Sequence, residues 1–443
     1  MTMQPERGSR SLFSRIKTRL LVLGLFCTMS AAPMEAATRL IVRTQALGLL
    51  QTACFLLGCN VQYGLGDDQG QLFLVTSPLN LSINLFLTVP GILNVELDST
   101  GLTSGATQTG APPALYDSTP VNYYGSSVRE GYVLQPATQI VGLANAQNTF
   151  GVHGSGIVAV IDTGVDTTHP VLANALVPGY DFTRNQSSAD EKGDVNQSTT
   201  AVVDQSTTAV VDQSTTAVVD GYRASQLNQP QYEAFGHGTM VSGLVHLVAP
   251  YARIMPLKAF HVDGTGYLSD VIRAIYFAAH NHAKVLNMSF SFTSSSTELN
   301  TALTYARLGG AISVAATGNN GLKTTVYPAG YSGTVMGVAS TSNVDVRSTF
   351  SNYGTPMTWL AAPGEGVVTL YPSSTYAATW GTSFSTPFVA GAAALLVDVQ
   401  PFCNQTQAAQ ALAHARYINN DLGNGRLDIV QAVQAFRQSL GLR

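Results

Sequence analysis

The segment Gly381–Gly391, GTSFSTPFVAG, constrains the fold of this 443-residue chain more than any other. We expect a tight, glycine-started turn that delivers Ser383 to the first turn of a helix. Pro387 is tolerated there because the first helical turn makes no intrahelical use of its N–H. The run from Phe388 to Val397 is apolar on every face, which predicts a helix buried inside a domain. Ser383 would then lie at the positive end of the helix dipole, beside backbone N–H groups that suit an oxyanion.

Two other segments suit a serine nucleophile. His237 lies between two glycines and precedes an apolar, helix-like sequence, and Asp162 ends the apolar run Gly156–Ile161. A histidine can accept the serine proton, and an aspartate can orient the histidine and stabilise its charged form. Taken singly, a GTS turn before an apolar helix is common, and an aspartate at a strand end is often only a turn or cap residue. Their combination favours Asp162, His237 and Ser383 as catalytic residues.

The three motifs VAVIDTGVD, FGHGTMVSG and GTSFSTPFVAG, in this order, resemble those of the subtilisin-like serine peptidases. The resemblance covers roughly residues 140–437 and implies a three-layer α/β fold with a mostly parallel central sheet. The D-T-G pattern at 162–164 favours Asp162 over Asp166 and makes His169 structural. In AATGNNG, Asn319 matches the family's side-chain donor to the oxyanion, although an Asn-Asn-Gly run is also an ordinary turn.

The resemblance also implies where a peptide substrate binds. Two segments match the edges between which a peptide lies as an added strand, and their residues are Gly264, Thr265, Gly266, Ser289, Phe290 and Ser291. Ser291 and Val326 are bulkier than the residues usual in the family, so we expect a narrow first specificity pocket. Val171 replaces an aspartate that ligates calcium in many relatives, which argues against that site. We assign no metal ligand and expect no cofactor for catalysis; a structural calcium stays open.

Apolar runs separated by amphipathic segments predict alternating strands and helices, and hence a parallel sheet covered on both faces. The helices are clearest at 268–282 and 297–308. The strand candidates are 156–161, 253–260, 284–289, 311–316, 335–340 and 358–362. In such a sheet the site lies at the carboxyl ends of the strands, and Asp162 and Asn319 both follow strand ends.

The N-terminal quarter divides into a targeting segment and a small domain. Residues 1–37 read as a signal peptide, with a basic front, a short apolar core and small residues after it. Residues 38–98 predict a βαββαβ order, that of a ferredoxin-like α+β domain. By position and pattern they resemble the family's prodomain, which assists folding and inhibits by placing its tail in the substrate cleft. The alternative is a small packing domain that stays attached. Cys54 and Cys59 can form a disulfide here.

Residues 99–130, rich in Ser, Thr, Gly and Pro, are interpreted as a linker, and residues 131–443 as the peptidase domain. Between Asp162 and His237 the octapeptide QSTTAVVD occurs three times in succession, at 197–220. Three identical units indicate recent tandem duplication. They are too polar and too few to form a solenoid, so we interpret them as a solvated surface loop. A metal-binding or substrate-gripping role for their aspartates is the less favoured alternative.

Composition fits an exported protein. Charged residues are only 11% of the chain, against the usual quarter, and the formal charge of −4 offers no basic surface for nucleic acid. We expect a secreted or periplasmic monomer that is free of the membrane after signal removal. Its partners would be polypeptide substrates and its own prodomain. The leading hypothesis is a serine endopeptidase made as an inhibited precursor. Two alternatives are a transferase that joins peptides through the same acyl-enzyme and a non-catalytic binding protein on this scaffold.

Overall fold

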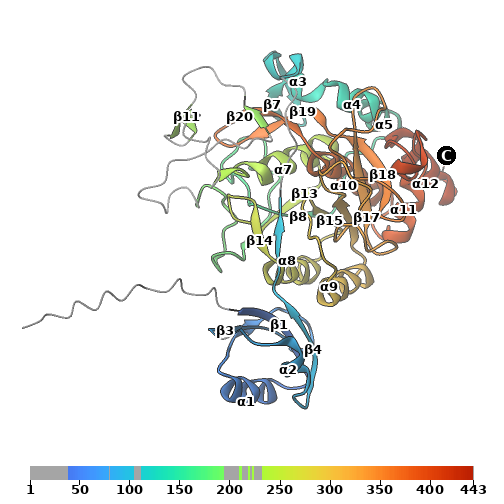
Figure 1. The fold of residues 1–443 in the computed structure, drawn as a ribbon. Helices are drawn as coiled ribbons and strands as arrows, with labels where there is room; N and C mark the ends of the chain where they lie inside the picture. The colour runs from blue at the N-terminus through green and yellow to red at the C-terminus, as the bar shows by residue number, and fades with distance from the viewer. Residues whose placement is uncertain are drawn as a thin grey trace, which may run out of the picture.

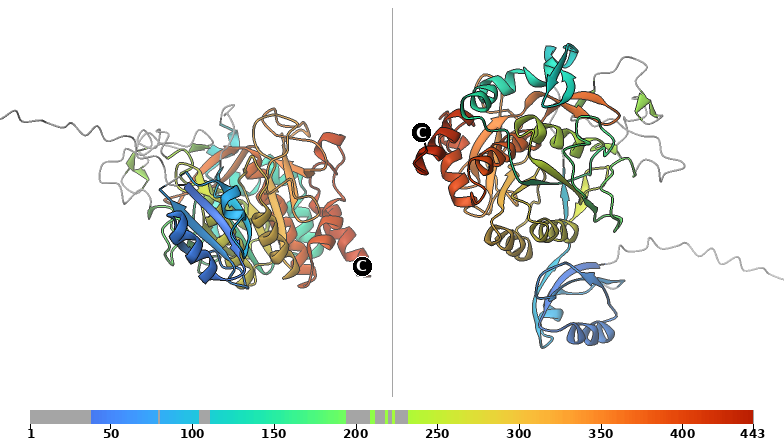
Figure 2. Two further views of the ribbon diagram at one scale, coloured as in Figure 1. Left: turned by 60° about the horizontal axis from the view of Figure 1, so that its bottom comes forward. Right: turned by 180° about the vertical axis from the view of Figure 1, so that it is seen from behind.

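The computed structural model describes residues 38–78, 80–103, 111–193, 209–211, 218–219, 222–223 and 232–442, so the predicted signal peptide lies outside it. The described residues form a small N-terminal domain and a large α/β domain (Figure 1). The small domain lies at one end of the large one, next to helices α8 (Leu268–His280) and α9 (Thr297–Leu308) (Figures 1 and 2).

The N-terminal domain has the predicted βαββαβ order. Its strands form an antiparallel sheet in the order β2-β3-β1-β4, which is a ferredoxin-like arrangement. A disulfide joins Cys54 to Cys59, and such a bond helps to stabilise a domain too small to bury much apolar surface. The elements are β1 (Thr38–Thr44), α1 (Leu47–Leu57), β2 (Asn60–Gly64), β3 (Leu72–Ser77), α2 (Ile83–Leu87) and β4 (Ile92–Leu97).

The central sheet of the large domain has seven strands in the order β18-β17-β16-β15-β8-β13-β9, each parallel to its neighbours. The apolar runs predict six of them to within two residues at each end, because strands buried on both faces are apolar throughout. Only β9 (Tyr180–Asp181) is too short to leave such a run. The other strands are β8 (Ile157–Asp162), β13 (Arg253–Lys258), β15 (Val285–Met288), β16 (Ile312–Ala316), β17 (Met336–Thr341) and β18 (Thr358–Pro363).

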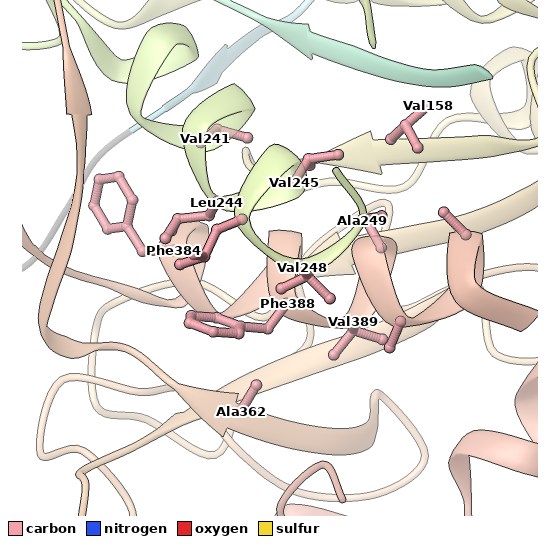
Figure 3. Close-up of a cluster of buried hydrophobic side chains, with 14 of the residues drawn as sticks. Val158, Val241, Leu244, Val245, Val248, Ala249, Ala362, Phe384, Phe388 and Val389 are labelled. Atoms are coloured by element: carbon pink, nitrogen blue, oxygen red, sulfur yellow. The ribbon is translucent and has the colours of Figure 1, made fainter. Parts of the chain in front are cut away.

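Helices cover both faces of this sheet. On one face, α7 (His237–Val248) packs against α10 (Thr382–Val399); α8 and α9 cover the other. Figure 3 shows Phe384 and Phe388 of α10 beside residues of α7 in this core. By length and hydropathy α10 could cross a membrane, but 89% of it is buried inside the protein. It is the buried helix that the sequence predicts, and the fold holds its first turn at the carboxyl ends of the strands.

The remaining elements surround this core. An antiparallel hairpin, β19 (Glu365–Tyr371) and β20 (Thr375–Trp380), leads directly into α10. The others are η1 (Pro113–Tyr116), β6 (Pro120–Tyr123), β7 (Ser126–Arg129), α3 (Glu130–Val133), α4 (Pro136–Ile140), α5 (Leu143–Phe150), β14 (Thr265–Tyr267), α11 (Gln405–Leu412), η4 (Asn420–Leu422) and α12 (Ile429–Ser439).

The structure differs from our interpretation of residues 99–130 as a linker. Thr100–Leu102 form strand β5, which pairs with β14 of the large domain. From residue 111 onward the chain forms η1 and the β6–β7 hairpin, and Leu115, Tyr123 and Val128 are buried in the large domain's core. Composition misled here because a few well-placed apolar side chains suffice to dock a polar segment against an existing core.

The repeats also contribute regular structure where a loop is expected. Strand β10 (Ala209–Val211), from the second repeat, pairs antiparallel with β20 and extends the β19–β20 hairpin to three strands. Strand β11 (Val218–Val219), from the third repeat, pairs with β12 (Tyr222–Arg223). The first repeat lies outside the described residues. The AVV unit, although short, is β-branched enough to add to an existing edge.

Candidate active site

Ser383 lies in the first turn of α10, and Gly381 precedes the helix with a φ of 147° that favours glycine. The position expected for Pro387 is wrong, however. The helix begins at Thr382, so Pro387 lies in its second turn. A proline there deprives the carbonyl four residues earlier of its helical donor, and that carbonyl belongs to Ser383. The Ser289 hydroxyl donates to it instead, at 2.7 Å.

Asp162, at the end of β8, and His237, the first residue of α7, lie together. Asp162 Oδ1 is 2.7 Å from His237 Nδ1, and both side chains are buried. The centroid of the His237 ring lies 5.2 Å from that of Phe384, the residue that follows Ser383. Its Nε2 has no hydrogen-bond partner within the described part of the chain, while Ser383 Oγ donates to the Ser289 carbonyl at 3.0 Å. The structure thus gathers the three predicted residues in one place.

The neighbouring Asp166 and His169 have other partners. Asp166 accepts hydrogen bonds from Thr168 and from the Ser373 N–H, and its Oδ1 is 3.0 Å from Lys192 Nζ. His169 is buried, which lowers the pKa of its imidazole, and its Nδ1 lies 3.3 Å from a backbone N–H. Both side chains therefore hold the loop that follows Asp162, whereas His237 pairs with Asp162 itself.

Asn319 lies in the turn after β16, next to the start of α10. Its side-chain oxygen accepts hydrogen bonds from the Thr382 N–H and the Thr382 hydroxyl, each of 2.9 Å. The Gly318 N–H also donates to the Thr382 hydroxyl, at 3.1 Å. These bonds fix the orientation of the Asn319 amide, so that its oxygen faces Thr382 and its NH₂ group points the other way. An amide held in this way can donate a hydrogen bond near Ser383.

Strand β5 lies between the two segments expected to bind a peptide (Figure 1). On one side it pairs antiparallel with β14, and the Thr103 N–H donates to the Gly264 carbonyl at 2.9 Å. On the other side, Leu102 and Ser291 exchange two backbone hydrogen bonds of 3.0 Å each. A strand added between two edges in this way is a common mode of peptide recognition. Here the chain itself supplies the strand.

The other expected cleft residues behave differently from one another. Ser289 contacts Ser383 through both its hydroxyl and its carbonyl. Phe290 is only 2% exposed and packs in the core against Phe260 and Phe292, with ring centroids 4.8 and 6.0 Å away, rather than against β5. Val326 is buried beside the turn that carries Asn319. Its Cγ2 would lie 3.6 Å from the Cβ of any side chain placed at position 318.

Sequence reasoning missed two contributors to this site. Residues 100–103 give no signal, because their partners lie more than 160 residues further along the chain. Thr382 looks like part of the turn before Ser383, but it anchors Asn319. Among the described residues, no group of three or more His, Cys, Asp or Glu side chains could hold a metal ion. Cys403 is buried, which raises the pKa of its thiol to about 12, so it is not a competing nucleophile.

Comparison with known proteins agrees with this geometry. Residues 154–431, which include Asp162, His237, Asn319 and Ser383, match the model of the subtilase family. The chain belongs to the subtilase family. Subtilases are serine-type endopeptidases that need no cofactor for catalysis. Thermitase from Thermoactinomyces vulgaris is 35% identical over 267 residues, or 58% of this chain and 80% of that protein. Subtilisin BL from Lederbergia lenta is 31% identical over 298 residues, or 64% and 91%.

Two further matches have narrower coverage. A thermophilic serine proteinase from Bacillus sp. strain AK1 is 37% identical over 243 residues, which is 54% of this subtilase, and the match spans about half, 52%, of that relative. The crystal structure of fervidolysin from Fervidobacterium pennivorans, described as a keratinolytic enzyme related to subtilisin, aligns with a TM-score of 0.68. That alignment covers 90% of this chain and 61% of fervidolysin at 21% identity, so it shows the shared fold alone.

Proposed function

We propose that this subtilase is a secreted serine endopeptidase, synthesised as a precursor that its own N-terminal domain inhibits. The observation that carries the proposal is the placement of β5. It lies as a peptide would between Gly264 and Ser291, and Ser289, two residues before Ser291, is hydrogen-bonded to Ser383 at the start of α10. Export rests on the N-terminal residues 1–37, whose basic front and apolar core fit a signal peptide.

In the proposed reaction, Ser383 Oγ attacks the peptide carbonyl and His237 Nε2 takes its proton. Asp162 accepts the Nδ1–H bond, which fixes the tautomer that leaves Nε2 as the base and stabilises the imidazolium that forms. The Ser383 hydroxyl donates to the Ser289 carbonyl in the precursor, so a rotation about its Cα–Cβ bond would turn it toward Nε2. The imidazolium then protonates the leaving amine, and water hydrolyses the acyl-enzyme by the reverse sequence.

The negative charge of the tetrahedral intermediate would be met by the Asn319 NH₂ group and by backbone N–H groups at the start of α10. Thr382 holds the Asn319 oxygen, so the amide is oriented before the charge develops. In this family, losing one such donor is known to cost about 10²–10³-fold in turnover. We expect Asn319→Ala to lower kcat by that factor.

The register of β5 also leads to an expected maturation bond. Leu102 and Ser291 form a closely spaced, doubly hydrogen-bonded pair. In an antiparallel ladder the next such pair is two residues further along each strand, so a bound peptide would place the residue two positions after the one opposite Ser291 against Ser289. The Ser289 carbonyl already contacts Ser383 Oγ. We therefore expect self-cleavage between Ser104 and Gly105.

Expression of the full chain and of its Ser383→Ala variant tests the proposal. The parent should yield a mature protein whose N-terminal sequence begins at Gly105, and Ser383→Ala should stay at full length, folded and inactive. Ser385→Ala is the matched control, because Ser385 is equally buried two residues further along α10 and should leave processing intact. Processing of purified Ser383→Ala would show that another protease makes the cut.

Two measurements separate the alternatives. A fluorophosphonate should label Ser383, which a non-catalytic binding protein would not allow. Product analysis with an added amine then distinguishes a transferase, which would give the coupled peptide as its main product, from a peptidase, which would give the free acid.

A further inference from the structure

The loops that carry Asp162 and His237 are linked through two threonines. Thr163 follows Asp162, and its hydroxyl accepts a hydrogen bond of 2.9 Å from the Gly238 N–H in the His237 loop. Thr239 follows Gly238, and its hydroxyl accepts one of 2.7 Å from the Asp166 N–H in the Asp162 loop. Each hydroxyl therefore receives a backbone N–H from the other loop, and the two bonds fix the loops relative to each other.

Both hydroxyls point at one buried carboxyl group, that of Glu191. Thr163 Oγ1 donates to Glu191 Oε2 at 3.3 Å, and Thr239 Oγ1 makes a short hydrogen bond to Oε1. Glu191 is only 1% exposed, and this burial raises the pKa of its carboxyl to about 8. A buried carboxyl is costly unless its oxygens are satisfied, so its retention here calls for a role.

The polarity of these bonds gives that role. A hydroxyl has a single proton, and a carboxylate has only acceptor atoms. Above its pKa, where Glu191 is ionised, both threonine protons point toward its carboxylate, and the lone pairs of both oxygens are left to accept the two backbone N–H groups. A neutral amide of the same shape would present a donor to one of the two hydroxyls. That hydroxyl would then lose its acceptor or give up its backbone partner.

We propose that Glu191 is a positioning residue for the Asp162–His237 pair. Its two carboxyl oxygens orient Thr163 and Thr239, and these threonines hold the two loops in register. The proposal rests on the proposed function, since it takes His237 as the base. Glu191 itself touches neither the substrate nor the reacting atoms.

The test compares Glu191→Gln with Glu191→Asp in the mature enzyme at an alkaline pH, above the pKa of the Glu191 carboxyl, so that the parent carries the carboxylate. Glu191→Gln keeps the shape but changes one acceptor to a donor. We expect it to lower kcat on a short peptide, and the rate of fluorophosphonate labelling, by about ten- to a hundredfold, with KM within about twofold, because small misplacements of catalytic groups have effects of this size. Glu191→Asp keeps two acceptors and should lie between Glu191→Gln and the parent. If Glu191→Gln fails to fold, a selective loss of kcat in Glu191→Asp supports the proposal, and an unchanged kcat overturns it.

Asp270→Asn is the matched control, because Asp270 is also a buried carboxyl, with a pKa raised by burial to about 7, and it lies on α8 away from both loops. It should leave kcat, KM and labelling unchanged. A kcat of Glu191→Gln within twofold of the parent would overturn the proposal, as would equal losses in Glu191→Gln and Asp270→Asn. The extent of labelling keeps the two proposals apart: slow but complete labelling of Glu191→Gln supports the positioning role, whereas no labelling of the parent means that the proposed peptidase function has failed.

Discussion

Pro387 affects the candidate nucleophile because proline has no N–H to donate to the Ser383 carbonyl. That carbonyl accepts a hydrogen bond from the Ser289 hydroxyl instead, while Ser383 Oγ donates to the Ser289 carbonyl. The serine is therefore tied by two hydrogen bonds to the edge segment along which β5 runs. A residue with an N–H at this position would donate to the Ser383 carbonyl and compete with the Ser289 hydroxyl. The proline therefore helps to set the geometry of the site.

His246, near the end of α7, should make the protein sensitive to acid. It is 5% exposed, and neither ring nitrogen has a hydrogen-bond partner within the described residues. Burial, followed by its interaction with His169, lowers the pKa of its imidazole to about 4. The unfolded chain binds this proton near pH 6.5. Stability should therefore fall as the pH drops from 6.5 through 4, by a total on the order of 3 kcal/mol from this group.

His246→Leu removes this sensitivity, since leucine does not titrate. We expect the thermal midpoint of His246→Leu minus that of the parent to be larger at pH 4.5 than at pH 8. Both proteins should carry Ser383→Ala to prevent self-digestion. The control is His414→Leu, an exposed histidine whose replacement should shift the midpoint equally at both pH values. A constant difference between His246→Leu and the parent would mean that the pKa of His246 is the same in the folded and unfolded protein.

Val326 should limit the size of the side chain that precedes the cut. It is buried beside Gly318, and the resemblance to the family implies that Val326 and Ser291 are bulkier than the residues usual at these positions. One methylene of misfit is worth about 1–3 kcal/mol, so peptides with Ala at this position should exceed those with Phe in kcat/KM by tens to a few hundredfold. The expected maturation bond follows a serine, which agrees with a small pocket.

Comparison of kcat/KM on peptides that carry Ala, Leu or Phe before the cut checks this expectation. Val326→Ala should raise kcat/KM for the Phe peptide, relative to kcat/KM for the Ala peptide, by about tenfold or more. Val335→Ala, a change in a buried valine of the same core, controls for lost packing and should leave the preference unaltered. If Phe is already the best substrate of the parent, the pocket has been misplaced.

At the scale of elements, the sequence predicts what is locally determined and misses what depends on a distant partner. The strands of the central sheet are continuous apolar runs, and α9 matches its predicted range of 297–308. Strand β5 has three residues and exists because β14 and Ser291 lie on either side of it. The catalytic candidates were identified by their motifs, but no local pattern marks Glu191, whose partners follow Asp162 and His237.

Any one of the three repeats should be able to form the edge strand that pairs with β20. Strand β10 uses only the AVV unit of the second repeat to pair with β20, which leads to Ser383. The same three residues occur in the other repeats. Deletion of residues 205–220 keeps one complete unit and changes the loop length by only 16 residues, so stability should move by about 1 kcal/mol or less.

Removal of residues 197–220 is the informative contrast, because it takes away every AVV unit and leaves β20 with an unpaired edge. We expect a clearly larger drop in the thermal midpoint of the Ser383→Ala protein, and in the kcat of the active one. Equal effects of the two deletions would mean that the pairing with β20 contributes nothing.

At the scale of the whole molecule, the two domains are joined by ion pairs and helix caps as well as by β5. Arg43 of the N-terminal domain forms an ion pair of 2.5 Å with Glu298 of α9, which is 1% exposed. Glu96 accepts hydrogen bonds at the start of the same helix, and Asp98 does so at Ser269 in the first turn of α8. Acidic side chains at helix N-termini are favourable positions, so the small domain docks on two helix dipoles.

Arg43→Ala should speed release of the N-terminal domain after cleavage, because it leaves the Glu298 carboxylate with the Asn94 amide but without its cationic partner. Truncating one member of a largely buried pair acts mainly on the dissociation rate, and we expect an increase of about ten- to several hundredfold. The measurement is timed gel filtration of Ser383→Ala protein cut in trans by the active enzyme. Arg253→Ala is the control and should leave the rate unchanged, because the Arg253 side chain donates to the Ala175 and Leu176 carbonyls of the large domain. Glu298→Gln should reduce the effect of Arg43→Ala; independent effects would exclude coupling of the pair.

The covalent path from β4 into β5 has a consequence for where activity begins. While the chain is intact, only a few residues connect β5 to the N-terminal domain. Its effective concentration at the edge segments is then in the millimolar range, whatever the concentration of the protein. Once the bond after residue 104 is cut, the same domain becomes a separate molecule, and its occupancy falls as the surrounding volume grows. If the N-terminal domain inhibits as proposed, the precursor would be inactive at any dilution, whereas the cut protein would be inactive only at high concentration. Release from a confined compartment into a large volume would then switch the enzyme on without any further signal.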